Sequence, residues 1–249
     1  MPRTHKSLPR LHVTDDLGPG ARVALGHDQT SYLLTVLRLK ADESVVLFNG
    51  RDGAWKARIA DAHRKGASLE LTEQVAPQTP PSDLWYGFAP LKTGRLDYVV
   101  QKATEMGAGT IQPVLTRYTQ VHRLKTDKLE ANVIEAAEQC EVLSVPVVAP
   151  EITLPDLLTR WQAAHGLRRL VVADEGAESA SPLDRLGELR GLPVGILVGP
   201  EGGFADEERA LLLAQSFVVP ISLGPRILRA DTAAVAALAL IQASIGDWR

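Results

Sequence analysis

"ILVGPEGGFADEER", residues 196–209, combines an apolar run, a turn rich in glycine and the expected start of a helix. A strand, a glycine turn and a helix N-terminus usually bind anions, because backbone N–H groups and the helix dipole converge there. The residues after Gly199 include no cation before Arg209 and four acids: Glu201, Asp206, Glu207 and Glu208. Since these charges repel phosphate, the stretch predicts a site for a ligand that has no phosphate and preferably carries a positive centre.

A second loop of this kind, LGPRILRADT at residues 223–232, follows another apolar run. Ligands of open α/β sheets bind at the carboxyl ends of the strands, where both loops are expected. Neither loop has the Gly-Lys-Ser/Thr of a Walker A motif or a GxGxxG motif, so motif and charge both argue against ATP and NAD. S-adenosylmethionine fits, because it has a sulfonium and no phosphate. Charge does not select this cofactor uniquely, and each loop alone is also compatible with an ordinary tight turn.

The chain divides into two segments that differ in their expected secondary structure. Residues 11–75 contain short alternating strands, an Asn49-Gly50 turn and one expected helix over 27–39. After a proline-rich stretch, 76–83, strands alternate with helices, which predicts an α/β domain with parallel strands. Strands are expected at 84–90, 110–116, 168–175, 192–200 and 217–224, and helices over 94–107, 126–141 and 231–246. Gly107 is expected to end the first of these helices, and Asp231 or Thr232 to cap the last.

Composition indicates an ordinary globular protein, with 45% apolar and 23% charged residues. The longest apolar run, Ala233–Ile241, is too short to cross a bilayer, and the N-terminus lacks the apolar region of a signal peptide. The single cysteine, Cys140, excludes an intrachain disulfide framework and fits a reducing cytoplasm. The six histidines show no metal-ligand spacing, so no metal site is expected.

The net charge of −3 argues against a general nucleic-acid binder, but two segments are locally basic. Residues 1–10 contain three cations and no acid, and residues 117–128 contain four cations and one acid. Such patches suit a local anionic partner, and a solvated surface is an equally good interpretation of either one alone.

Taken together, the two glycine loops resemble those of a known enzyme family. LVGPEGGF followed by SLGPRILRADTA and an alanine-rich helix is similar to the 16S ribosomal RNA N3-uridine methyltransferases of the SPOUT superfamily, the RsmE family. HDQTSYLLTVLRLKADESVVLFNGRDG resembles the N-terminal PUA-like module of that family. LKTGRLDYVVQKATEMGAGTIQPVLTRYT resembles the start of its catalytic domain, and EAAEQC its central helix. The resemblance covers nearly the whole chain.

This resemblance implies a PUA-like β-barrel domain for RNA binding over residues 1–75 and a SPOUT methyltransferase domain over 76–249. The last strands and helix of the second domain would form a trefoil knot. The implied protein is a cytoplasmic homodimer with no membrane or metal partner, in which the partner chain completes each active site. Its substrate would be 16S rRNA or the small ribosomal subunit, and its cofactor S-adenosylmethionine. The residues implied in cofactor binding are Leu197, Gly199, Pro200, Glu201, Gly202, Leu223, Gly224, Ile227, Leu228 and Thr232.

Methylation of uracil N3 requires loss of the N3 proton, and cationic donors stabilise the resulting anion best in a preorganised site. Arg226 and Arg229 are the expected donors, although either could instead pair with an acid. Glu201 and Asp231 are the nearest carboxylates, either as a base or to hold an arginine. The residues expected to contact RNA from the N-terminal module are Lys6, Arg10, Arg38 and Lys40.

Two positions depart from the family pattern. Glu141 and Val142 stand where the family usually has Gly-Arg, and Ala230-Asp231 replaces the usual Thr-Glu. The first change removes a positive charge expected near the substrate, and the second keeps the carboxylate on a shorter side chain. Two alternatives therefore stay open: a related SPOUT methyltransferase that acts on another RNA position, or a catalytically silent RNA-binding or ribosome-assembly factor.

Overall fold

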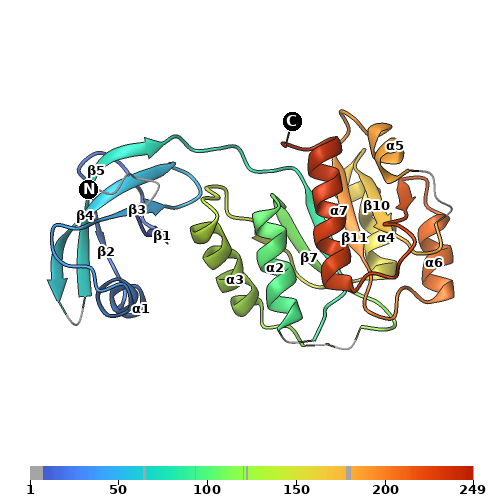
Figure 1. The fold of residues 1–249 in the computed structure, drawn as a ribbon, viewed down its shortest axis with the longest axis horizontal. Coiled ribbons are helices and arrows are strands. Elements are labelled where there is room, and N and C mark those ends of the chain that lie inside the picture. Colours follow the sequence, from blue (N-terminus) through green and yellow to red (C-terminus); the bar gives the residue numbers. More distant parts are fainter. Residues whose placement is uncertain are drawn as a thin grey trace. The chain divides into compact units, whose positions relative to one another are not determined.

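The computed structural model describes residues 8–63, 66–92, 94–119, 121, 123–177 and 181–248. The chain forms two compact units, one of residues 1–80 and 137–145 and the other of residues 81–136 and 146–249. Figure 1 shows a β-rich first unit and a second unit in which helices surround a sheet. No helix in the described part of the chain is long and apolar enough to cross a lipid bilayer.

The first unit is built on a five-stranded sheet in the order β1-β3-β4-β5-β2. β1 and β3 pair in parallel and the other neighbours are antiparallel. The strands are β1 Arg10–His12, β2 Arg22–Ala24, β3 Ser44–Phe48, β4 Ala54–His63 and β5 Gly66–Ala76. The helix expected over 27–39 is a short α-helix, α1 (His27–Ser31), followed by a π-helical turn, η2 (Tyr32–Val36).

The turn between β3 and β4 follows from its residue types. Gly50 and Gly53 both have positive φ, +77° and +80°, which glycine adopts without steric cost. The side-chain amide oxygen of Asn49, Oδ1, accepts hydrogen bonds from the backbone N–H groups of Arg51 and Asp52 at 3.0 and 2.9 Å. These local bonds fix the hairpin that the Asn-Gly pair predicts.

Residues 137–145 complete an apolar cluster in the first unit. Ala137 and Leu143 pack with Val46, Phe48 and Ala54. These residues include the end of α3 (Thr126–Gln139) and the turn after it. Cys140 lies in this turn and is exposed.

The second unit contains a parallel sheet in the order β12-β10-β11-β6-β7-β8, with β9 pairing β7. This confirms the α/β fold class. The strands are β6 Trp85–Phe88, β7 Thr110–Leu115, β8 Val147–Val148, β9 Ile152–Thr153, β10 Arg169–Ala173, β11 Val194–Val198 and β12 Val218–Ile221. Every residue of β11 is buried, as expected for a strand covered on both faces.

Helices cover both faces of this sheet (Figure 1). α7 packs against α2, α5 and β11, whereas α4 packs against α6 and β7. Trp161 and Leu158 of α4 form a hydrophobic core with Trp85, Leu170 and Leu197 from the strands. The helices are α2 Arg95–Glu105, α4 Leu154–His165, α5 Pro182–Gly187, α6 Asp206–Leu213 and α7 Ala230–Ser244. The strand and helix pattern of the sequence did not single out α4 and α5.

The ends of two helices differ in detail from the sequence prediction. α7 has Arg229 as its N-cap, in an extended conformation and without a side-chain cap. Asp231 and Thr232, the expected caps, lie one and two residues inside the helix, and the Asp231 carboxylate accepts a hydrogen bond from the Thr232 N–H at 2.9 Å. α2 ends at Glu105 with Met106 as its C-cap, and Gly107 follows with φ +80°.

Candidate functional site

The site lies where the carboxyl ends of β10, β11 and β12 meet. Because the strands are parallel, the loops that follow them emerge at one edge of the sheet and enclose a cavity of about 300 Å³. The lining residues are Ala173–Gly176, Val198–Glu201, Gly203, Phe204, Asp206, Arg209, Leu223, Gly224, Arg226–Leu228, Ala230 and Ala233. Two predicted loops and a third, after β10, therefore form one site.

Glycine leaves the backbone of these loops open to the cavity. A Cβ atom on Gly199 would lie 3.1 Å from the Phe204 ring, so a side chain there would crowd the loop. Gly203 and Gly224 have φ angles of +71° and +108°, which other residues rarely adopt. Four residues of the cavity lining, Gly176, Gly199, Gly203 and Gly224, therefore have no side chain between their backbone and a ligand.

The loop after β10 is held by an ion pair that sequence analysis missed. The Asp174 carboxylate, whose side chain is only 7% exposed, accepts hydrogen bonds from Arg209 Nε at 3.0 Å, and Arg209 Nη2 lies 2.9 Å from Asp174 Oδ2 in the same ion pair. The N–H of Gly176 donates to the same carboxylate at 3.0 Å, and Arg209 Nη2 donates to the Gly176 carbonyl at 3.0 Å. The carboxylate raises the pKa of the Arg209 guanidinium above its usual range. The sequence feature that could have indicated this loop is Asp-Glu-Gly at residues 174–176, which directly follows the buried strand β10 as the glycine turn follows β11.

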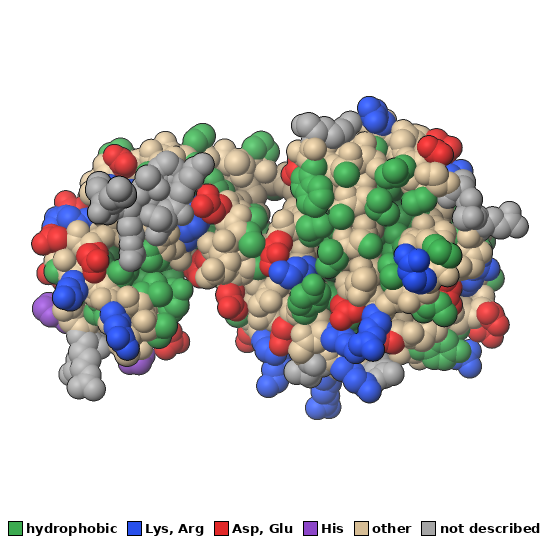
Figure 2. Space-filling model, viewed as in Figure 1, with side chains coloured by type: hydrophobic (Ala, Val, Ile, Leu, Met, Phe, Trp, Pro, Cys, Tyr) green, Lys and Arg blue, Asp and Glu red, His purple; other side chains and the backbone are tan. Residues whose placement is uncertain are grey.

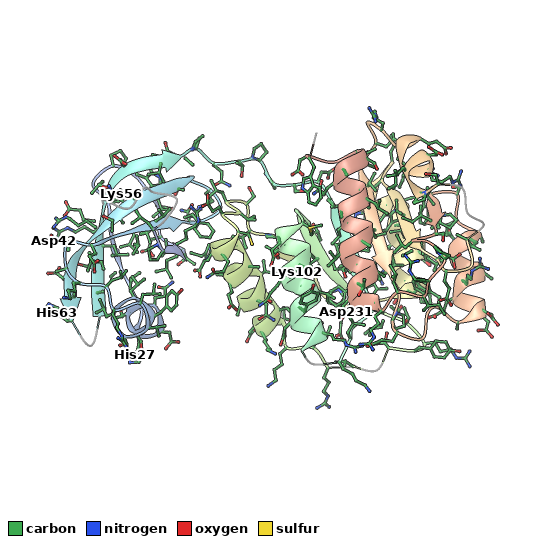
Figure 3. The ribbon with its side chains drawn as sticks, viewed as in Figure 1. His27, Asp42, Lys56, His63, Lys102 and Asp231 are labelled. Atoms are coloured by element: carbon green, nitrogen blue, oxygen red, sulfur yellow. The ribbon has the colours of Figure 1, made fainter. Side chains whose placement is uncertain are left out.

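A second cation, Arg95, joins the two carboxylates predicted from separate loops. Arg95 is the first residue of α2, and its Nη1 lies 3.4 Å from Glu201 Oε1 while its Nε lies 3.8 Å from Asp231 Oδ2. Asp231 lies at the end of α7 nearest this edge of the sheet (Figure 3). Among the described residues, the cation that pairs with Glu201 and Asp231 is Arg95, and neither Arg226 nor Arg229 forms an ion pair with them. β6 neighbours β11, which explains why the helix after β6 reaches the glycine loop.

The structure brings most of the predicted cofactor and catalytic residues to the cavity. Those that line it are Gly199, Pro200, Glu201, Leu223, Gly224, Arg226, Ile227 and Leu228. Leu197 is fully buried in the sheet core, and the exposed residues Arg229 and Thr232 lie outside the lining. Gly202 also lies outside it and faces Tyr118, whose Cβ is 3.6 Å from the position of a Cβ built on Gly202.

The charge of the cavity agrees with the sequence argument. Its lining includes four carboxylates and two guanidinium groups: Asp174, Glu175, Glu201, Asp206, Arg209 and Arg226. One of these guanidinium groups, that of Arg209, is already paired with Asp174. The remaining excess of negative charge in the lining favours a cationic or neutral ligand over a phosphate. Among the residues that the structure describes, no three His, Cys, Asp or Glu side chains are grouped so that they could hold a metal ion.

The residues expected to contact RNA have different surroundings in the first unit. Arg38 and Lys40 are exposed after η2. Arg10 is half-buried in β1, with its guanidinium 5.4 Å from the centre of the Phe48 ring, and burial lowers its pKa. Lys6 lies outside the described residues.

Comparisons with known proteins agree with this geometry. Residues 78–242 match the model of an RNA methyltransferase domain, and residues 25–72 match that of an RNA methyltransferase PUA domain. The chain is 34% identical to the ribosomal RNA small subunit methyltransferase E of Rickettsia conorii over 94% of each protein. The chain belongs to this methyltransferase family. It is also 34% identical to the Synechocystis protein of the same name, over 94% of this chain and 77% of that protein.

A solved structure extends the family likeness to the whole fold. The ribosomal RNA small subunit methyltransferase E of Neisseria gonorrhoeae, bound to S-adenosylmethionine, matches with a TM-score of 0.85 and 27% identity. The match covers 97% of this chain and all of that one. The chain is thus an RNA methyltransferase with a PUA domain and a parallel α/β catalytic domain, as the sequence resemblance implies.

Proposed function

We propose that this methyltransferase transfers a methyl group from S-adenosylmethionine to N3 of a uridine in the 16S rRNA of the small ribosomal subunit. The observation that carries the proposal is the cavity at the sheet edge, whose lining includes four glycines and an excess of carboxylates. The names of its full-length relatives and the cofactor bound to the Neisseria protein support S-adenosylmethionine-dependent methylation of small-subunit rRNA.

The residues present fit this cofactor. The backbone of Gly199, Pro200, Leu223 and Gly224 would hold adenine and ribose, since these groups need close approach and hydrogen bonds rather than charge. When bound, the cofactor supplies an electrophilic methyl group on a positively charged sulfur. Gly202, Ile227, Leu228 and Thr232 would support the loops that hold it, and Leu197 would anchor the first loop from the core. Glu201 and its neighbouring carboxylates stabilise a positive charge at this edge.

The arginines of the second loop would act on the nucleotide. Arg226 lines the cavity and Arg229 ends the same loop, so both can face a uracil placed above it. Their guanidinium groups would stabilise the charge that spreads over O2 and O4 as N3 loses its proton. One of Glu201 and Asp231, the carboxylates near this position, would take the N3 proton, and Arg95 would hold both in place. These loops would also place uracil N3 in line with the methyl group that is transferred.

The first unit would anchor the rRNA through its exposed cations, Arg38 and Lys40, together with Lys6 and Arg10.

We further propose that the protein is a cytoplasmic homodimer in which the partner completes each site. The last strands and helix would form a trefoil knot: β12 is the edge strand beyond β10, yet α7 returns to pack on β11 between α2 and α5. Residues 1–75 and 76–249 would then be the RNA-binding and catalytic domains.

Methylated nucleosides in 16S rRNA from a deletion strain test this function directly. We expect one N3-methyluridine to disappear and to return when the wild-type gene is restored, but not when Gly199→Val is supplied. Loss of a different methylated nucleoside would indicate a related methyltransferase with another target. If no nucleoside is lost and calorimetry detects no S-adenosylmethionine binding, the protein is a silent assembly factor and the proposal is wrong.

A further inference from the structure

A second surface, formed by the loops after β6 and β7, lies at the same edge of the sheet as the cavity. β6 and β7 follow β11 in the strand order, so their loops emerge beside the glycine loop of the cavity. The cavity half of this edge is acidic, whereas the exposed charged side chains of the described loops after β6 and β7 are all cations: Lys92, Arg117, Arg123 and Lys125. Figure 2 shows Lys and Arg side chains gathered along this edge of the second unit.

Tyr118 is the aromatic residue of this basic surface. The residue is 47% exposed, although a tyrosine gains free energy by burying its ring. The ring lies against the glycine loop: the position of a Cβ on Gly202 is 3.6 Å from Tyr118 Cβ and Cδ2. An aromatic face is therefore presented to solvent directly beside the proposed cofactor loop.

The turn that carries Tyr118 is rigidly held. Thr116 and Thr119 are buried, and the Thr116 N–H donates to Thr119 Oγ1 at 2.9 Å while the Thr119 N–H donates to the Thr116 carbonyl at 3.1 Å. The N–H of Arg117 donates to Glu208 Oε1 on α6 at 2.8 Å. A ring fixed in this way loses little conformational freedom when a ligand stacks on it.

The neighbouring cations are available to an anionic strand. Arg117 has a 3.4 Å ion pair with Glu207, but both side chains are largely exposed, so a phosphate can replace this weak interaction. The side chains of Arg123 and Lys125 form no ion pair with any described residue. They border a hollow of about 560 Å³, whose lining also includes the apolar residues Leu124, Leu129 and Pro150 and one carboxylate, that of Glu151.

We propose that Tyr118 stacks on a base of the RNA strand that carries the target uridine, while Arg117, Arg123 and Lys125 contact its phosphates. The inference rests on the proposed function, and it names Tyr118 as a positioning residue that holds a neighbouring base. Exposed aromatic rings combined with cations are the usual means of binding single-stranded RNA, because every base has a π face. The strand would pass from the hollow, over Tyr118, to the cavity.

The test compares two RNA probes of equal length and charge, an oligouridylate and an oligomer of abasic ribose-phosphate, with the full-length protein. Wild type is expected to bind the oligouridylate more tightly. Tyr118→Ala should weaken oligouridylate binding about 5- to 150-fold and leave the abasic probe unaffected. Tyr118→Phe should bind as wild type does, whereas Tyr118→Leu, which keeps an apolar contact with the glycine loop, should behave like Tyr118→Ala.

Two kinds of control separate stacking from other effects. Arg123→Ala and Lys125→Ala should weaken both probes equally and reduce the salt dependence of binding. Leu167→Ala, which removes an exposed apolar side chain at the opposite edge of the sheet, should change neither probe. Calorimetry should give all variants the S-adenosylmethionine affinity of wild type.

Three results would overturn the inference. They are equal binding of the two probes by wild type, equal effects of Tyr118→Ala on both, or loss of cofactor affinity in that variant, which would make Tyr118 a support for the Gly202 loop. If any one of these results is found while wild type still methylates 16S rRNA, only the inference about Tyr118 fails. Absence of rRNA methylation by wild type would instead refute the proposed function.

Discussion

The ion pair between Asp174 and Arg209 predicts an asymmetric response to mutation. The Asp174 side chain is 7% exposed and that of Arg209 is 40% exposed. Arg209→Ala leaves a buried carboxylate without its cation, a change that typically costs 3–5 kcal/mol. Because water can enter where the exposed guanidinium was, and because the Gly176 N–H bond remains, we expect about 2–3 kcal/mol. Asp174→Asn keeps an acceptor for Gly176 and leaves a solvated cation, so it should cost only about 1 kcal/mol.

Urea unfolding, followed by circular dichroism and tryptophan fluorescence, measures these differences. Arg160→Ala is the matched control, because Arg160 forms a 3.9 Å ion pair with Asp156 in which both side chains are more than half exposed. It should lower the free energy of unfolding by less than about 0.5 kcal/mol. Equal costs for Arg209→Ala and Asp174→Asn, or a cost for Arg209→Ala as small as that of the control, would refute the reasoning.

Arg229→Ala should lower the single-turnover methylation rate about 10²–10³-fold with little change in S-adenosylmethionine affinity, because one donor to the uracil anion is lost. Raising the pH should restore part of the rate of this variant, and Arg229→Lys should keep part of the wild-type rate. A loss of cofactor affinity without a loss of rate would show that Arg229 binds the cofactor instead. Arg95→Gln should slow methylation by releasing Glu201 and Asp231, but should cost less than about 1 kcal/mol in urea unfolding, because these ion pairs are long and partly exposed; an unchanged rate would contradict the proposed positioning. Burial and the charge of Arg168 lower the pKa of His165 below its unfolded value of about 6.5, so stability should be full above about pH 6.5 and decrease as pH falls below it. His165→Gln should show a shallower decrease in the urea midpoint, and a slope equal to that of wild type would exclude this histidine as a cause.

Local sequence patterns were sufficient for much of the fold and for part of the site. Continuous apolar runs predict buried strands such as β11, and the change from alternating strands to strand-helix alternation predicts the α/β domain. The glycine turn after residue 198 predicts a ligand site, since glycine spacing and an excess of acids are properties of the loop itself. These features depend on residues close together in the chain, so they can be read from the sequence directly.

Only the tertiary structure shows which distant residues meet. The Asp174–Arg209 pair joins residues 35 positions apart, and Arg95 reaches Glu201 across 106 positions because β6 and β11 are neighbours in the sheet. The rigid presentation of Tyr118 likewise depends on α6, which no local pattern around Tyr118 could indicate. The physical reason is that periodicity and turn chemistry specify each strand and loop separately. Which loops then share an edge of the sheet is decided by the strand order, which depends on packing over the whole domain.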